Sequence, residues 1–320
     1  MNKAYVTGPT GAIGLALIDK LNSVGIDVTI FVRPDSKRAE RLLEEGAFGD
    51  AKVIKCDLRD IADYTLRLQN NAQDNMQGTA SDAVFYHLGW AGTTGSARMD
   101  MRLQLENAEH TLDALELANK LGCRRFVGVG SQAEYGRCES ILTNDTPCNP
   151  ETGYGFAKLM AGRMSRIRAK QLGIEHVWTR VLSVYGRGDN ENTLIASLIS
   201  GLSSGREVHC TRGEQIWNYI SAAEAAELLY RLGDAGDASG NTYCIAGPGS
   251  HTLREYMERV RNQVIELYGQ SPDIIYDRPY PEGQVMYLDA DITELCRVCG
   301  YTPRDDFEEQ IRELIRGENI

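Results

Sequence analysis

Short apolar runs alternate with longer amphipathic stretches through the first half of the chain. The apolar runs are rich in Val, Ile, Phe and Tyr, which is typical of β-strands; they are Lys3–Thr7, Asp27–Val32, Lys52–Lys55, Ala83–His87 and Arg125–Val129. Residues 12–24 and 102–121, between such runs, carry apolar side chains at helical spacing. Repeated strand–helix units predict an α/β fold, a doubly wound parallel sheet with helices on both faces.

The second half is less regular. The pattern predicts strands over 176–184, 215–220 and 242–246, and helices over 194–202, 222–232, 252–268 and 307–316. The polar stretch 69–81 reads as a surface loop or a frayed helix end. We therefore expect a sheet domain over 1–185, to which the strand near 242–246 returns, and a smaller interleaved lobe over 186–320.

Composition and charge exclude several classes of protein. Among 320 residues, 42% are apolar and 25% charged, as in ordinary globular proteins. Acidic residues number 45 against 34 basic ones, a net charge of −11 that argues against binding nucleic acid or anionic membrane through bulk charge. No apolar run reaches the roughly 18 residues of a membrane span, and the first strand begins too early for a signal peptide.

The eight cysteines are scattered rather than clustered, which favours reduced thiols in the cytoplasm. Only Cys296 and Cys299 form a CxxC pair, without a second pair or a nearby His. We therefore expect no metal site.

A glycine-rich turn joins the first strand to the first helix. It reads Thr7-Gly8-Pro9-Thr10-Gly11-Ala12-Ile13-Gly14. Glycine allows a tight turn and close approach of the backbone to a pyrophosphate, and the helix N-terminus offers free N–H groups to the phosphates. Placed between a strand and a helix, this turn predicts a dinucleotide site formed by Thr7, Gly8, Thr10, Gly11, Ala12, Ile13 and Gly14.

The end of the second strand bears on which dinucleotide binds. An Asp or Glu there would meet a free ribose 2′-hydroxyl, but the aligned position is Val32 and the basic residues Arg33, Lys37 and Arg38 follow. Such a cluster would neutralise a 2′-phosphate, so NADP(H) is preferred. NAD(H) stays open, because Asp35 could turn toward the ribose. Asp57, which precedes Leu58 just past the third strand, is placed to accept from the adenine amino group.

Three residues in chain order suggest proton transfer to a carbonyl oxygen. Ser131 follows the fifth strand, and Tyr154 and Lys158 share one face of a predicted helix. A free tyrosine titrates near 10, and a nearby ammonium would lower that value. Ser131 would hold the substrate oxygen toward Tyr154 by a hydrogen bond.

Together these motifs resemble the extended short-chain dehydrogenase/reductases, also called the NAD-dependent epimerase/dehydratase family. The segments that carry the resemblance are TGxxGxxG, 87–91 (HLGWA), Asn107, 130–136 (GSQAEYG), 154–158 (YGFAK) and 180–186 (RVLSVYG). The resemblance implies a Rossmann-type domain, a C-terminal substrate lobe, a Ser–Tyr–Lys site and a nucleotide-linked sugar as substrate.

The resemblance also assigns some residues. It places Leu88 in the cofactor site and Asn107 in the proton-relay environment. It further implies a homodimer that pairs through the long helices near 102–121 and 154–172.

Departures from the family pattern bear on the reaction. Sugar 4,6-dehydratases place an Asp-Glu pair directly after the catalytic Ser or Thr, where this chain has Gln132 and Ala133. Alanine cannot transfer a proton, and Glu134, one residue later, is expected to point away from the site. The sequence therefore favours reduction of a keto group, or epimerisation through a transient ketone, over dehydration.

The substrate lobe departs as well. Ser183 and Trp217 stand where the family has an asparagine and an arginine that contact the diphosphate. Arg187, Arg206 and Arg278 could compensate, with Arg278 the best match to a later family arginine. Trp90 and Trp217 could line a stacking surface or simply pack between the lobes. Candidate substrate residues are thus Trp90, Gln132, Ser183, Arg187, Trp217 and Arg278.

The sequence as a whole predicts an NADP(H)-dependent oxidoreductase that reduces a keto group on a nucleotide-activated deoxysugar. The alternative is a nucleotide-sugar 4-epimerase with tightly bound NAD. A non-catalytic, cofactor-sensing regulator is a third reading, disfavoured because the chain keeps both Tyr154 and Lys158.

Overall fold

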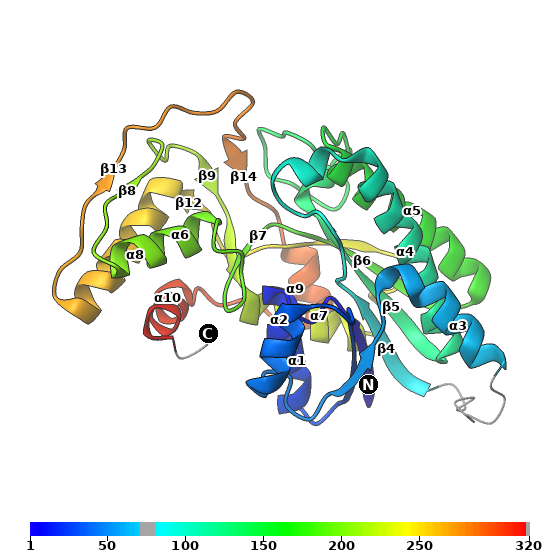
Figure 1. Ribbon diagram of the computed structural model, residues 1–320. Coiled ribbons are helices and arrows are strands. Elements are labelled where there is room, and N and C mark those ends of the chain that lie inside the picture. Colours follow the sequence, from blue (N-terminus) through cyan, green and yellow to red (C-terminus); the bar gives the residue numbers. More distant parts are fainter. Residues whose placement is uncertain (71–80, 318–320) are drawn as a thin grey trace.

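Seven parallel strands form the main sheet of the protein. The computed structural model describes residues 1–70 and 81–317, and the sheet order is β11–β6–β5–β4–β1–β2–β3. The strands are Lys3–Thr7 (β1), Asp27–Val32 (β2), Lys52–Lys55 (β3), Ser81–His87 (β4), Cys123–Ser131 (β5), Glu175–Val181 (β6) and Thr242–Ile245 (β11). The predicted doubly wound, Rossmann-type α/β fold is confirmed (Figure 1).

Helices cover both faces of this sheet (Figure 1). One face carries Ala12–Ser23 (α1), Lys37–Glu44 (α2), Ala222–Asp234 (α7) and Thr293–Cys299 (α9); the other carries Ile61–Asn70 (α3), Met101–Lys120 (α4) and Gly153–Leu172 (α5). Successive strand residues point to opposite faces. In β1, Ala4 and Val6 enter the core beneath α1 and α7, and Tyr5 enters the core beneath α4. Burial on both faces explains why these strands read as continuous apolar runs.

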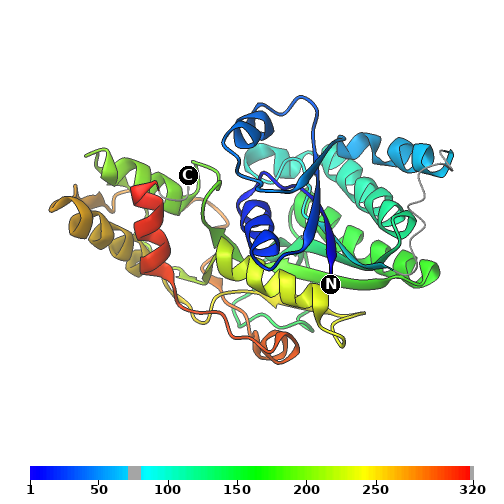
Figure 2. The same cartoon turned by 90° about the horizontal axis from the view of Figure 1, so that it is seen from below.

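A smaller lobe lies beside the sheet (Figure 1), and Figure 2 shows that its last helix, Phe307–Arg316 (α10, red), lies on the side of the lobe that faces α7. Its elements are Ser183–Tyr185 (β7), Leu194–Ser203 (α6), Val208–His209 (β8), Ile216–Trp217 (β9), Tyr219–Ser221 (β10), His251–Thr252 (β12), Leu253–Tyr268 (α8), Ile274–Ile275 (β13), Tyr287–Leu288 (β14) and Phe307–Arg316 (α10). The short strands form the ladders β10–β7, β12–β9–β14 and β13–β8. Leu198, Met257, Val260 and Ile311 form the centre of a core separate from that of the sheet.

The chain passes repeatedly between the sheet and the lobe. α7, β11 and α9 belong to the second half of the sequence, yet they pack on or join the main sheet. β11 pairs in parallel with β6 at the sheet edge. The division into 1–185 and 186–320 stays a prediction.

Four segments differ from the expected pattern. The basic turn after β2 continues into a helix, α2, because Ser36 caps it by accepting from the Ala39 amide at 3.2 Å and Leu42 is buried. The strand expected over 176–184 is divided into β6 and β7, and that over 215–220 into β9 and β10. Of the expected loop 69–81, residues 71–80 lie outside the described residues, and its ends belong to α3 and β4.

Across residues 1–70 and 81–317, no helix has the length and apolar character needed to cross a membrane. The same part of the chain holds no group of three or more His, Cys, Asp or Glu residues placed to bind a metal ion.

Candidate active site

The carboxyl ends of the parallel strands meet at one edge of the sheet. Thr7 ends β1, His87 ends β4 in register with it, and Ser131 ends β5. In doubly wound sheets, ligands bind in the crevice outside the carboxyl ends of the strands. The predicted site residues Thr7 and Ser131 therefore come to the same edge through the topology alone.

The glycine turn opens toward this edge. Gly8 has a φ of 70° and a Cβ there would lie 2.6 Å from the Gly89 nitrogen, so only glycine fits. A Cβ on Gly11 would meet nothing closer than 4.0 Å, which leaves open space over the start of α1. No side chain of the described residues caps that helix start. This cradle of helix-start amides, with Thr10, Ala12, Ile13 and Gly14, fits a pyrophosphate group.

Thr7 connects β1 to the loop after β4. Its Oγ1 lies 2.9 Å from His87 Nδ1 and accepts from the Gly89 amide at 3.2 Å, and the Leu88 amide donates to the Thr7 carbonyl at 3.2 Å. Burial lowers the pKa of His87 to about 3, so this imidazole is neutral. His87 therefore orients Thr7 and does not act as an acid near pH 7.

The predicted basic cluster lies on the surface after β2. Arg33 and Lys37 are exposed to solvent. Arg38 donates through Nη2 to the Gly188 carbonyl, in the loop that follows β7. Arg33 and Lys37 are thus available to a ligand as they stand. Arg38 would first have to break its hydrogen bond to Gly188.

Asp57 has a protein partner as well. Its carboxylate accepts from the backbone amide of Arg59 at 3.0 Å, capping Leu58–Asp60 (η1), and from Arg59 Nε at 3.1 Å. Burial would raise the pKa of Asp57, but the hydrogen bonds from Arg59 lower it overall. Leu58 lies against Gly89, where an added Cβ would meet Leu58 Cδ1 at 2.9 Å. The adenine contact predicted for Asp57 stays a prediction.

Tyr154 and Lys158 lie on the first turns of α5, beside Ser131. The helix begins after Thr152, whose hydroxyl accepts from the Gly155 amide at 3.0 Å. Lys158 Nζ donates to the Val129 carbonyl of β5 at 2.6 Å, and both side chains are buried. The structure thus brings together the three residues that the sequence predicted for catalysis.

Burial shifts the titration of both groups. It raises the pKa of Tyr154, against which the Ser131 hydroxyl and the Arg98 charge act to lower it. Burial lowers the pKa of Lys158 to about 7. An ammonium near a phenol would stabilise the phenolate, so this pair has the chemistry to hold or release a proton.

The loop after β4 is held by α4. Asn107 Oδ1 accepts from the Ala91 amide at 2.8 Å, and its Nδ2 donates to the Ala91 carbonyl at 3.0 Å. Trp90 Nε1 donates to Gln104 Oε1 at 2.8 Å. Trp90 in turn covers Tyr154 and Lys158, with Lys158 Nζ 3.8 Å from its ring centroid and the Tyr154 ring edge-on to it. Asn107 fixes this loop, and the relay role that the resemblance implied stays a prediction.

Arg98 is a residue that sequence reasoning missed. It lies in Gly95–Met99 (η2), and its guanidinium carbon is 4.3 Å from the centroid of the Tyr154 ring. No motif marks it, because the contact forms only when the loop after β4 folds against the start of α5. Gln104 was missed for the same reason.

The residues after Ser131 do not supply an acid–base pair. They form Gln132–Glu134 (η3), in which Ala133 is buried and Gln132 half-buried. Glu134 is fully buried, and its carboxylate accepts from Trp178 Nε1 at 3.0 Å and from Arg180 Nε at 2.8 Å. That carboxylate is therefore committed to a structural ion pair.

Two of the predicted substrate residues contact each other. Trp217 Nε1 donates to Ser183 Oγ at 2.7 Å, across β9 and β7, and the indole packs against two hydrophobic cores. Arg187 lies against α1, 4.0 Å from Asp19. Arg278 lies beside β8, where its amide donates to the Cys210 carbonyl at 3.0 Å. The structure does not gather these four residues into one cluster.

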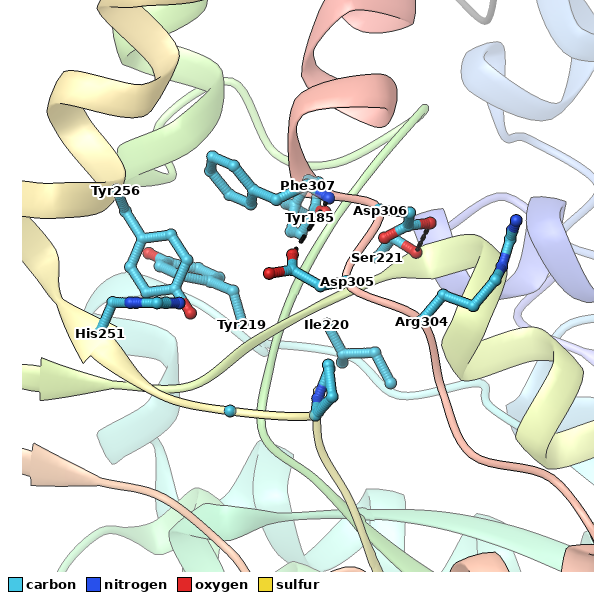
Figure 3. Close-up of a pocket in the computed structure, with 12 residues that line it drawn as sticks. Tyr185, Tyr219, Ile220, Ser221, His251, Tyr256, Arg304, Asp305, Asp306 and Phe307 are labelled. Carbon is cyan, nitrogen blue, oxygen red and sulfur yellow. Dashed lines mark hydrogen bonds between the residues drawn. The ribbon is translucent and has the colours of Figure 1, made fainter.

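A separate cavity of about 230 Å³ lies at the base of the lobe (Figure 3). Tyr185, Tyr219 and Tyr256 line it together with Asp306, which accepts from the Ser221 hydroxyl at 2.9 Å. None of the three predicted catalytic residues lines this cavity.

A model of the NAD-dependent epimerase/dehydratase family matches residues 4–246. A dTDP-glucose 4,6-dehydratase from Haemophilus influenzae is 22% identical, over 99% of this chain and 97% of that protein.

Solved structures give similar matches. A UDP-N-acetylglucosamine 4-epimerase from Methanobrevibacter ruminantium M1, in complex with UDP-N-acetylmuramic acid, superposes with a TM-score of 0.83 at 23% identity, covering 98% of this chain and 97% of its own. MoeE5, in complex with UDP-glucuronic acid and NAD, superposes with a TM-score of 0.78 at 21% identity, covering 98% of each chain.

Proposed function

The chain belongs to the NAD-dependent epimerase/dehydratase family, and from that premise we propose that it is a nucleotide-sugar 4-epimerase that works with bound NAD. This departs from the reductase that the sequence favoured and adopts its alternative. Similar structures include a nucleotide-sugar 4-epimerase and a protein in complex with NAD.

The observation that carries the proposal is the grouping of Ser131, Tyr154 and Lys158 at the edge where the glycine turn opens. Ser131 would hold the sugar oxygen, and Tyr154 would take its proton and later return it. The ammonium of Lys158, 6.0 Å from the Tyr154 ring centroid, would stabilise the phenolate. Epimerisation needs one group that works in both directions, and Tyr154 meets that need.

The residues after Ser131 argue against dehydration. Removal of water needs an acid and a base beside the sugar, but Ala133 has no proton to transfer and Glu134 is paired with Arg180. Among the described residues, the site therefore has a group that can take and return a proton, and lacks that acid–base pair; the hydride acceptor would be the bound NAD.

The glycine turn fits the cofactor. When bound, NAD supplies a reversible hydride acceptor. The open start of α1 and Gly11 would bind its pyrophosphate, and Lys158 would hold the nicotinamide ribose.

Extraction of nucleotide from freshly purified protein tests the proposal. Denatured protein should release about one NAD per chain, and incubation of the native protein with UDP-hexoses should interconvert the C4 epimers, as followed by NMR. Release of no nucleotide, with turnover only when NADPH is added, would overturn it.

A second candidate is an NADP(H)-dependent ketoreductase acting on a nucleotide-activated deoxysugar. The specific observation that favours it is the end of β2, where Val32 replaces an acid and Arg33 and Lys37 are exposed. Arg33→Asp should then weaken NADPH binding at least tenfold more than NADH binding in a fluorescence titration. Equal effects on both nucleotides would remove this candidate.

A further inference from the structure

Arg98 places a positive charge directly at the predicted proton donor. Its guanidinium carbon lies 4.3 Å from the Tyr154 ring centroid, and Trp90 packs edge-on against the same ring with centroids 6.1 Å apart. Tyr154 is therefore bordered by a cation and an indole. Neither belongs to the Ser–Tyr–Lys set.

The position of Arg98 is fixed by the fold. Gln104, nearly fully buried, donates through Nε2 to the carbonyls of Gly92 and Ala97 at 2.9 Å each. On the other side, a Cβ on Gly153 would lie 3.2 Å from the Arg98 carbonyl, so the segment packs closely on the start of α5. α4 and α5 thus hold η2 against Tyr154.

Most of the N–H donors of the Arg98 guanidinium are not used within the described residues. Within the described residues, its side chain makes one hydrogen bond, from Nη1 to the Thr93 carbonyl at 3.2 Å, and no ion pair with a carboxylate. The side chain is partly buried. The carboxylate of Glu134, whose charge acts on Tyr154 and Lys158, is bound to Arg180.

We propose that Arg98 binds an anionic group of the substrate beside the reacting sugar carbon. This inference rests on the proposed function, because it assumes a nucleotide sugar with its reacting hydroxyl at Tyr154. A guanidinium without a carboxylate partner matches the planar, two-oxygen geometry of a carboxylate or a phosphate. Two groups of such a substrate have this chemistry: a carboxylate on the sugar, and the diphosphate.

Kinetics of Arg98→Gln with a neutral and an acidic substrate separate the two sources. The probes are UDP-glucose and UDP-glucuronic acid. They differ only at C6 of the sugar, which is a hydroxymethyl group in the first and a carboxylate in the second. If Arg98 binds the carboxylate, KM for UDP-glucuronic acid should rise about 10- to 100-fold, with less than a threefold change for UDP-glucose. If it binds the diphosphate, KM should rise by similar factors for both. Unchanged KM for both substrates would overturn the inference, since a residue that only shapes Tyr154 would alter kcat and the pH profile.

Two further variants complete the experiment. Arg98→Lys keeps the charge without the fork of donors, so KM should recover in part. Arg102→Gln, an exposed arginine one turn further along the chain, should match the wild type. Calorimetric titration of UDP-glucuronic acid and of UDP into Tyr154→Phe, with and without Arg98→Gln, measures the same contact without turnover.

The two proposals fail separately. If the wild type converts neither sugar but the Arg98 variant loses binding in calorimetry, the proposed function fails, whereas the contact of Arg98 with an anionic group of the ligand stands. If the wild type is active and binding is unchanged in the variant, the inference alone fails.

Discussion

At the scale of the residue, Tyr154 and Lys158 acquire their chemistry from their surroundings. Both are buried, and burial opposes the charged form of each, raising the pKa of the phenol and lowering that of the ammonium. A bound cofactor and substrate would add charge to this site. The pair is thus expected to gain its working protonation state only when the site is filled.

Tyr154→Phe removes the hydroxyl and keeps the ring beneath Arg98. We expect kcat to fall about 100- to 10,000-fold, the range for loss of a positioned acid or base, with nucleotide content unchanged. Steady-state assays and nucleotide extraction measure both quantities. Tyr268→Phe, at an exposed position of α8, is the control, and full activity in the Tyr154 variant would refute its catalytic role.

Lys158→Met should remove a pH-dependent cost to stability in the cofactor-free protein. Because burial lowers the pKa of Lys158 to about 7, the unfolded chain binds this proton more readily than the folded one. Above the ordinary lysine pKa the side chain is neutral in both states, and its burial has no electrostatic cost. As the pH falls toward 7, protonation of the unfolded chain lowers the free energy of unfolding of the wild type. Relative to the wild type, the variant should gain on the order of 2–4 kcal/mol between pH 10 and 7.

Urea unfolding at several pH values measures this difference. Lys170→Met, an exposed lysine on the same helix, is the matched control and should show no such trend. A variant curve parallel to that of the wild type would mean that Lys158 is not desolvated in the folded protein.

At the scale of the element, long periodic segments were predictable and short ones were not. The helix predicted over 194–202 is Leu194–Ser203, and that over 307–316 is Phe307–Arg316. β8, β9 and β12 have two residues each, too few to show any period. They form because the lobe brings their backbones together, as where β12 pairs with β9.

The start of α10 contains a buried carboxyl group, that of Asp306, which stabilises the folded protein only when it is protonated. Burial raises the pKa of Asp306 to about 6, helped by Glu224 and opposed by the Ser221 hydrogen bond and Arg304. The folded protein therefore binds this proton more readily than the unfolded chain. Protonated Asp306 therefore contributes its full share of the free energy of unfolding below the ordinary aspartate pKa. That contribution is lost as the pH rises through 6.

Asp306→Asn keeps an oxygen for Ser221 and removes the charge. We expect the variant to exceed the wild type in unfolding free energy by about 1–3 kcal/mol at pH 8, and the gap to close at pH 4. Chemical denaturation at the two pH values tests this. The exposed Asp50→Asn is the control; a gap that stays constant with pH would contradict the explanation.

At the scale of the whole molecule, α4 and α5 carry exposed apolar side chains on their outer surface. Leu105 is 56% exposed, Phe156 58% and Ile167 63%, although these helices bury their other sides against the sheet. Phe156 and Ile167 are spaced to share one face of α5. An apolar patch of this kind is typical of an interface between protein chains.

We expect the protein to form a homodimer through this surface. Replacing both Phe156 and Ile167 with Glu should weaken association at least 100-fold, because two charges would be buried at the contact. Light scattering coupled to size-exclusion chromatography measures the mass, and Tyr268→Glu on the remote α8 is the control. A wild-type protein that elutes as a 35.5 kDa monomer would contradict the prediction.

The sequence by itself determined the doubly wound fold, the glycine turn, and the Tyr154–Lys158 pair. Each of these depends on residues that are close together in the sequence: a period of apolar residues, a strand–turn–helix junction, and a spacing of one helical turn. Only the tertiary structure decided that Arg98 packs against the Tyr154 ring, that Trp90 packs against Lys158, and that Glu134 forms an ion pair with Arg180. These contacts join residues from different elements, and packing of the whole chain, which no local pattern encodes, brings them together.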